Sequence, residues 1–123
     1  MSAKRFNQGK TQWSLVDFPS LEGAVRVLEI GKEKYGAFNW KKGLYTTKIS
    51  ESLMRHLFAY LDGEDIDEDG LRHIDHIICN SMFLSYMDNK KPEFDDRESL
   101  QSNKKTKLSL KAIIKKFLKG VKK

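Results

Sequence analysis

The fold is decided by residues 48–88, which read KISESLMRHLFAYLDGEDIDEDGLRHIDHIICNSMFLSYMD. Two stretches with apolar residues at helical spacing flank the short acidic connection 62–70. Their apolar positions are Leu53, Met54, Leu57, Phe58 and Leu61 before the connection and Leu71, Ile74, Ile77, Ile78 and Met82 after it. A connection this short predicts an antiparallel helical hairpin, and Ser50 is the expected N-cap of its first helix.

All three histidines of the chain flank this acidic connection. His73, His76 and Asn80 fall at i, i+3 and i+7, on a strip beside the apolar face of the second helix. The hairpin brings Arg55 and His56 of the first helix towards them, which is the arrangement of a binding site. The alternative is that the histidines only hydrogen-bond their neighbours and that the connection is a solvated turn.

The connection also matches the first half of a calcium-binding EF-hand loop. Asp65, Asp67 and Asp69 alternate, and Gly70 takes the sixth position. His76 stands at the twelfth position, where that loop needs a bidentate Glu. The pattern therefore departs from an EF-hand at the ligand that calcium depends on most.

Composition limits the class of protein. The chain has 123 residues, of which 39% are hydrophobic and 33% charged, and this suits one small soluble domain. No run approaches the ~18 apolar residues that span a bilayer, and residues 1–6 lack the apolar core of a signal peptide. We therefore expect a cytoplasmic protein. The single cysteine, Cys79, lies in an apolar run and is expected to be a small buried hydrophobe rather than a nucleophile.

The positive charge belongs to the C-terminal part of the chain. Residues 1–88 hold 11 Lys and Arg against 13 Asp and Glu, whereas residues 89–123 hold 12 against 4. We divide the chain into a lead-in (1–14), a helical domain (15–88), a linker (89–107) and a basic amphipathic tail helix (108–123). The tail has three interpretations: docking on the acidic core or a partner subunit, binding nucleic acid, or touching an anionic membrane surface.

A further helix is predicted from Leu21, with Ser20 as its N-cap. Along one of its faces Glu29 and Glu33 follow Glu22 at helical spacing. Carboxylates stacked in this way can share a divalent cation. The alternative is a solvated face with an ion pair between Arg26 and Glu22.

The segment 31–44 combines three glycines, three aromatic residues and four lysines and is predicted to be a loop. Trp40 offers a face on which a base can stack, Asn39 can read a base edge, and Lys34 can meet a phosphate. The alternative is that the aromatic side chains only fill the core beneath the loop.

Spaced motifs run through these segments. They are V-x-VL-x-x-G-x-x-KYG-x-x-NW-x-x-G at 25–43, RHL at 55–57 and DGED-x-D-x-x-GL-x-H-x-x-H at 62–76. Together they resemble the phage-type dATP/dGTP diphosphohydrolase domain over about residues 12–88. That domain is similar to the all-α, MazG-like pyrophosphohydrolases, which use magnesium held by helix carboxylates. The resemblance implies a small antiparallel all-α bundle that acts on a purine deoxynucleoside triphosphate, in the host cytoplasm if the protein is phage-encoded.

The metal motif departs from the MazG pattern of Glu-Glu-x-x-Glu and Glu-x-x-Asp. This chain has His73 and His76 at the second motif, and Glu51-Ser52-x-x-Arg55-His56 near the first. Because magnesium prefers oxygen ligands, two imidazoles favour manganese, zinc or another transition metal. We expect a divalent cation, magnesium or manganese, with a transition metal as the alternative.

The leading hypothesis is metal-dependent hydrolysis of dATP or dGTP to the monophosphate and pyrophosphate by a homo-oligomer, a dimer or a tetramer. The alternative is a non-catalytic helical module delivered to nucleic acid by its basic tail. The candidate metal ligands are Glu29, Glu33, His56, His73 and His76; the candidate catalytic residues are Glu29, Glu33, Lys34 and Arg55; the candidate substrate contacts are Lys34, Asn39, Trp40, Arg55 and Asn80.

Overall fold

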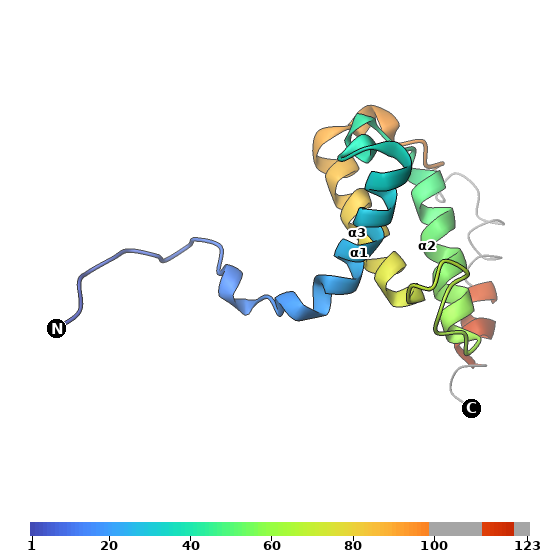
Figure 1. Cartoon of the computed structure of the whole chain (residues 1–123), viewed down its shortest axis with the longest axis horizontal. Coiled ribbons are helices and arrows are strands. Elements are labelled where there is room, and N and C mark those ends of the chain that lie inside the picture. The colour runs from blue at the N-terminus through green and yellow to red at the C-terminus, as the bar shows by residue number, and fades with distance from the viewer. Residues whose placement is uncertain (99–111, 120–123) are drawn as a thin grey trace.

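The computed structural model describes residues 1–98 and 112–119, and this part of the chain is all-α, as predicted (Figure 1). Its long helices are α1 (Glu22–Tyr35), α2 (Thr46–Leu61) and α3 (His73–Lys90). Short 3-10 turns occupy Trp13–Leu15, Phe18–Leu21, Asn39–Lys42 and Pro92–Phe94. In the described residues, extended pairing is limited to one isolated bridge between Ile66 and Arg72.

Helix α3 is the centre of the fold. It packs along α2 in the predicted antiparallel hairpin, so that His56 meets His73 while Ser52, a turn earlier, meets Asn80. Helix α1 also packs on α3, but it shares few contacts with α2. The two outer helices therefore lie on different sides of α3, which decides what each can contribute to a site.

Helix α1 starts and ends later than the sequence predicts. Its N-cap is Leu21, because the hydroxyl of Ser20 turns back to the carboxylate of Asp17 within the preceding 3-10 turn. The prediction of Ser20 as N-cap is therefore wrong. At the other end the helix continues through Gly31 to Tyr35 and stops at Gly36, whose φ is 92°. The predicted loop is thus five residues shorter at its start.

The start of α2 is fixed from a distance. Asp96 accepts hydrogen bonds from the Thr47 backbone N–H (2.9 Å) and hydroxyl (2.6 Å), so the helix begins at Thr46 and the prediction of Ser50 as N-cap is wrong. The ring of Phe94 packs against Tyr45 (5.1 Å between centroids) and against Gly43. Residues 92–97, which the sequence assigned to the linker, thus contact the first turn of α2.

The core is small and partly polar. Among the residues that the structure describes, its buried apolar side chains are Ala24, Ile49, Cys79 and Met87, and its buried polar ones are His73, Asp75 and Asn80. Cys79 is a buried small hydrophobe, as predicted, and burial raises the pKa of its thiol to about 11. Its thiolate is therefore scarce at neutral pH. Close approach of α1 to α3 depends on Gly23, because the Asp75 carboxylate occupies the space that a Cβ would take.

The structure describes part of the predicted tail. Residues 112–119 are helical (Figure 1). The ring of Phe117 packs on Phe58 of α2 with 4.9 Å between centroids. The remaining tail residues, 108–111 and 120–123, and the linker residues 99–107 lie outside the described residues. Among the helices that the structure describes, none combines the length and the apolar character needed to cross a bilayer.

Candidate active site

The three histidines gather where α2 passes the first turn of α3. The Nδ1 atoms of His56 and His73 lie 2.8 Å apart, and the rings of His56 and His76 stack in parallel with 4.2 Å between centroids. Because His73 and His76 stand three residues apart at the start of α3, the helix turns both towards α2. The hairpin thus brings His56 to His73 and His76, as their positions in the sequence predicted.

The acidic connection folds its carboxylates onto this cluster. Asp69 Oδ2 accepts a hydrogen bond from His76 Nε2 at 2.8 Å, and Asp67 Oδ2 lies 3.8 Å from the same nitrogen. Backbone hydrogen bonds between Asp67 and Leu71 (2.8 Å) and between Gly70 and Asp67 (2.9 Å) hold the turn in this shape. The two aspartates therefore face imidazoles instead of forming an all-oxygen calcium cage.

Two groups of metal-binding side chains result. One consists of His56, Asp67 and His73, and the other of Asp67, Asp69 and His76; in each group the ligand atoms lie within 4.8 Å of one another. Nitrogen and carboxylate ligands in combination fit manganese, iron, cobalt or zinc better than magnesium or calcium. The residues present therefore fit a divalent transition metal.

His73 has an unusual environment. It is only 3% exposed, and among the described residues its Nε2 is the buried side-chain atom that lacks a hydrogen-bond partner. The nearest carboxylate oxygen, Glu64 Oε2, lies 3.6 Å away on a mostly exposed side chain. Leaving a buried polar atom unsatisfied costs about 1–3 kcal/mol of stability. Such an atom in a folded protein therefore indicates a functional role or a bound ion or water that satisfies it.

The protonation states suit a cation site. Burial and the neighbouring His76 lower the pKa of His56 below its ordinary value of 6.5, which favours the neutral imidazole that metals require. Partial burial acts to raise the pKa of Asp69, but hydrogen bonds from Leu71 and His76 outweigh it and hold that pKa below the usual range. At neutral pH the cluster thus combines neutral His56 with ionised Asp69.

Several predicted site residues lie elsewhere. Glu29 and Glu33 belong to neither metal-binding group, because they stand on α1, which packs on a different side of α3 from α2. Lys34 is exposed near the end of α1. Arg55 is exposed on α2. Of the two predicted phosphate contacts, Lys34 and Arg55, it is the one adjacent in sequence to a histidine of the cluster, His56.

Asn80 is buried, and its Nδ2 donates a hydrogen bond to Ser52 Oγ at 3.2 Å. That bond links α3 to α2 one turn beyond the histidines. It gives Asn80 a structural partner, and its contact with substrate stays a prediction.

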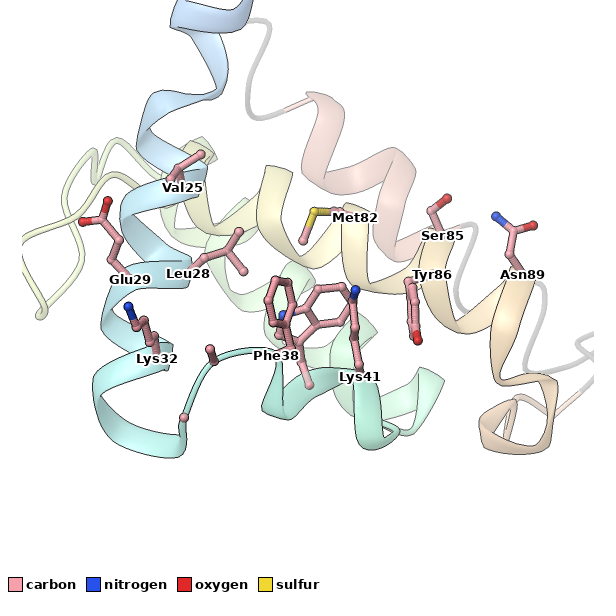
Figure 2. A pocket seen from close by; sticks show the side chains of 13 residues that line it. Val25, Leu28, Glu29, Lys32, Phe38, Lys41, Met82, Ser85, Tyr86 and Asn89 are labelled. Atoms are coloured by element: carbon pink, nitrogen blue, oxygen red, sulfur yellow. The ribbon is translucent and has the colours of Figure 1, made fainter.

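The second predicted region forms a separate pocket. A cavity of about 700 Å³ opens between α1, residues 36–41 and the second half of α3 (Figure 2). Its lining includes Val25, Leu28, Glu29, Lys32, Phe38, Trp40, Lys41, Met82, Tyr86 and Asn89. The lining is mainly apolar and aromatic, with charged groups near α1 and at Lys41.

The aromatic residues of this pocket divide into two kinds. Trp40 is a wall, since its ring lies 4.9 Å from the rings of both Phe83 and Tyr86 on α3. Phe38 is 63% exposed at a φ of 58°, with Lys41 Nζ 4.4 Å from its ring centroid, and Tyr35 is 68% exposed. The alternative that the aromatic side chains only fill the core therefore holds for Trp40, but not for Phe38 or Tyr35.

Asn39 is half-buried beside Trp40 and lines an adjoining cavity of about 410 Å³. Tyr86 follows His76 by ten residues, or about 15 Å along the helix axis at 1.5 Å per residue. The structure thus separates Asn39 and Trp40 from the histidine cluster, although the sequence analysis had assigned all of them to one site.

The predicted site residues did not include Asp67, Asp69 or Glu64, although the first two were considered as ligands of an EF-hand loop. The signal was available, because these acidic residues alternate in a very short connection between histidine-bearing helices. Their contribution depends on the turn closing over the helix ends, and helical spacing does not predict that closure.

A helical hairpin with polar ligands gathered between facing helices defines a class of all-α proteins that build metal and ligand sites inside a bundle. The family model described as "dATP/dGTP diphosphohydrolase, N-terminal" matches residues 2–97. The chain belongs to this family. The resemblance read from the motifs is therefore confirmed.

One relative sharpens this assignment. A dATP/dGTP diphosphohydrolase of Salmonella phage PMBT28 is 37% identical over 98 residues, which cover 79% of this chain and 33% of the relative. The chain thus spans about a third of the length of the curated relative that it matches. No solved structure matches the chain.

Proposed function

We propose that the chain hydrolyses a purine deoxynucleoside triphosphate, dATP or dGTP, to the monophosphate and pyrophosphate, with a divalent cation held at the histidine cluster, in the cytoplasm of a phage-infected cell. Family membership and the name of the phage relative support the reaction. The observation that carries the site is the convergence of His56, His73 and Asp67, with an unsatisfied buried nitrogen on His73.

The residues of the cluster have distinct roles in this proposal. His56, His73 and Asp67 hold the cation, which when bound neutralises phosphate charge and lowers the pKa of a water molecule. Asp69 orients the imidazole of His76 through the 2.8 Å hydrogen bond. Arg55, exposed beside His56, presents a planar guanidinium to phosphate oxygens.

We assign base recognition to none of these cluster residues. Trp40 packs on Phe83 and Tyr86, which follow His76 by seven and ten residues, or about 10–15 Å along the helix axis at 1.5 Å per residue. We therefore assign its ring no contact with a phosphate bound at the cluster. We propose a dimer or tetramer, and the exposed side chains of Val25 and Met82 beside the pocket supply apolar surface for such an assembly.

The test is incubation with each deoxynucleoside triphosphate in magnesium, manganese, cobalt or zinc, followed by chromatography of the products. We expect pyrophosphate and a purine monophosphate from the wild type and the Glu68→Gln control, but not from His73→Gln. Glu68 lies in the same turn, is exposed and belongs to neither metal-binding group. Inorganic phosphate without pyrophosphate would overturn the proposed reaction.

A second candidate function rests on the tail. In the described helix 112–119, Lys115, Lys116 and Lys119 are exposed while Phe117 packs on α2. If this surface binds nucleic acid, affinity should fall steeply with salt and disappear when residues 107–123 are removed, while nucleotide hydrolysis survives. Salt-independent binding, or binding retained after the truncation, would reject the tail as a nucleic-acid site.

A further inference from the structure

Asp67 belongs to both metal-binding groups of the cluster. His56 and His73 lie on one side of it, and Asp69 and His76 lie on the other. A carboxylate has two oxygens and about four lone-pair positions, so one side chain can serve two cations at once. The shared aspartate is therefore the feature that distinguishes this cluster from a simple three-ligand site.

We propose that the cluster binds two divalent transition-metal ions bridged by Asp67, the first held by His56 and His73 and the second by Asp69 and His76. The inference deepens the proposed function and rests on its cation site. It adds a second cation position, makes Asp67 a bridge, and turns Asp69 and His76 from hydrogen-bond partners into ligands of the second ion.

The first position is supported by the facing imidazole nitrogens. His56 Nδ1 and His73 Nδ1 are 2.8 Å apart. Nitrogens at this separation fit adjacent ligand positions, about 90° apart, on an ion with bonds of about 2.0–2.1 Å. In the metal-free state one proton must lie between the two nitrogens, and a cation can replace it.

An independent observation also points to this position. His73 is almost fully buried, yet its Nε2 has no hydrogen-bond partner. When an imidazole binds a metal through one nitrogen, the other N–H usually donates to a carboxylate. Glu64 Oε2, at 3.6 Å on an exposed and therefore adjustable side chain, is placed for that role.

The second position follows from the stacked rings. His56 and His76 are parallel to within 3°, with 4.2 Å between their centroids. An imidazole lone pair lies in the ring plane, so ions bound by the two rings are at least as far apart as the two planes. Paired metal sites in proteins have separations of about 3.5–4 Å, which this stacking allows.

The charges of the surrounding groups also favour two ions. Asp67, Asp69 and Glu64 bring three carboxylates to the histidine cluster. These three carboxylates would offset most of the charge of two divalent cations.

The experiment measures manganese bound per chain in the nucleotide-free, full-length protein, by equilibrium dialysis and metal analysis, together with the manganese electron paramagnetic resonance spectrum. We expect about two ions per wild-type chain and a spin-coupled spectrum. His73→Gln and Asp69→Asn should each bind about one ion and lose the coupling, and Asp67→Asn should lose at least one ion. Glu68→Gln, which makes the same charge change in the same turn, should retain two.

The outcomes separate this inference from the proposed function. One uncoupled ion per wild-type chain overturns the two-ion site and leaves the proposed cation site standing. No bound manganese at millimolar concentration overturns both. Both decisive results come from the wild type, so a variant that fails to fold does not weaken the test, and circular dichroism identifies such a variant.

Discussion

The histidine cluster and the aromatic pocket are built in different ways, although both use α3. The cluster draws His56, Asp67 and His73 from one hairpin, so its parts are close in the chain as well as in space. The pocket joins Val25 to Asn89 and needs α1, the 36–41 segment and α3 to pack correctly. Helical spacing therefore predicts the cluster well and the pocket poorly. We expect substitutions in the cluster to change turnover and substitutions in the pocket to change stability.

The largest expected effect comes from the cluster. His56→Gln removes an imidazole that faces both other histidines, and we expect turnover of dATP or dGTP to fall at least ~100-fold with manganese present. Glu51→Gln, exposed on the same helix, serves as the control and should keep normal turnover. Near-normal turnover of His56→Gln would remove the cluster from the chemistry.

The next effect is structural and belongs to the pocket. Trp40→Ala removes a half-buried ring from between Phe83 and Tyr86, and we expect a loss of about 2–3 kcal/mol in denaturant unfolding. The catalytic constant per folded molecule should stay the same, because Trp40 packs on the half of α3 away from the cluster.

Trp40→Phe should recover most of the lost stability. An intact melting transition with a tenfold loss of turnover in Trp40→Ala would instead return Trp40 to the active site and erase the contrast between the two regions.

A smaller effect concerns acid. Because the pKa of His56 is lowered in the folded protein, unfolded chains bind more protons than folded ones below pH 6.5. The metal-free protein should therefore be fully stabilised above that pH and lose stability as the pH falls, by less than about 1.4 kcal/mol per pH unit for this one group. Urea titrations between pH 5 and 7.5 measure how steeply the free energy of unfolding changes with pH, and this slope should be smaller in His56→Gln. An equal slope in both proteins would assign it to other groups.

The hairpin was predictable because its signals are local: two apolar stripes, a nine-residue acidic connection at 62–70 and histidines three residues apart. The start of α2 was not predictable, because its capping carboxylate, Asp96, lies 49 residues beyond Thr47. The roles expected of Glu29 and Glu33 depended on which side of α3 would receive α1, and spacing within one helix carries no such information.

The site followed the same rule. Three of the predicted metal ligands were brought together, while Asp67 and Asp69 had been considered only as ligands of an EF-hand loop and were not included in the predicted histidine site. The directions of side chains in such a turn cannot be predicted from their spacing. They depend on backbone hydrogen bonds that close the turn, such as the one from Asp67 N–H to Leu71 C=O (2.8 Å).

The smallest expected effect tests why Phe38 is kept in a left-handed conformation. Phe38→Gly relieves the strain of a φ of 58° and loses the contact with Lys41, so we expect a change in stability of no more than about 1 kcal/mol. Phe38→Asn, which also tolerates this conformation, is the matched variant. A raised KM for nucleotide in both variants would show that the exposed ring belongs to the substrate site and would join the two regions.

The central claim is that the cation lies between α2 and α3. Crystals soaked in manganese and measured near its absorption edge locate the ion directly through anomalous scattering. We predict the strongest anomalous peak between His56, His73 and Asp67, within about 2.0–2.3 Å of their ligand atoms. A peak at Glu29 and Glu33 on α1, with none at the histidines, would contradict the account.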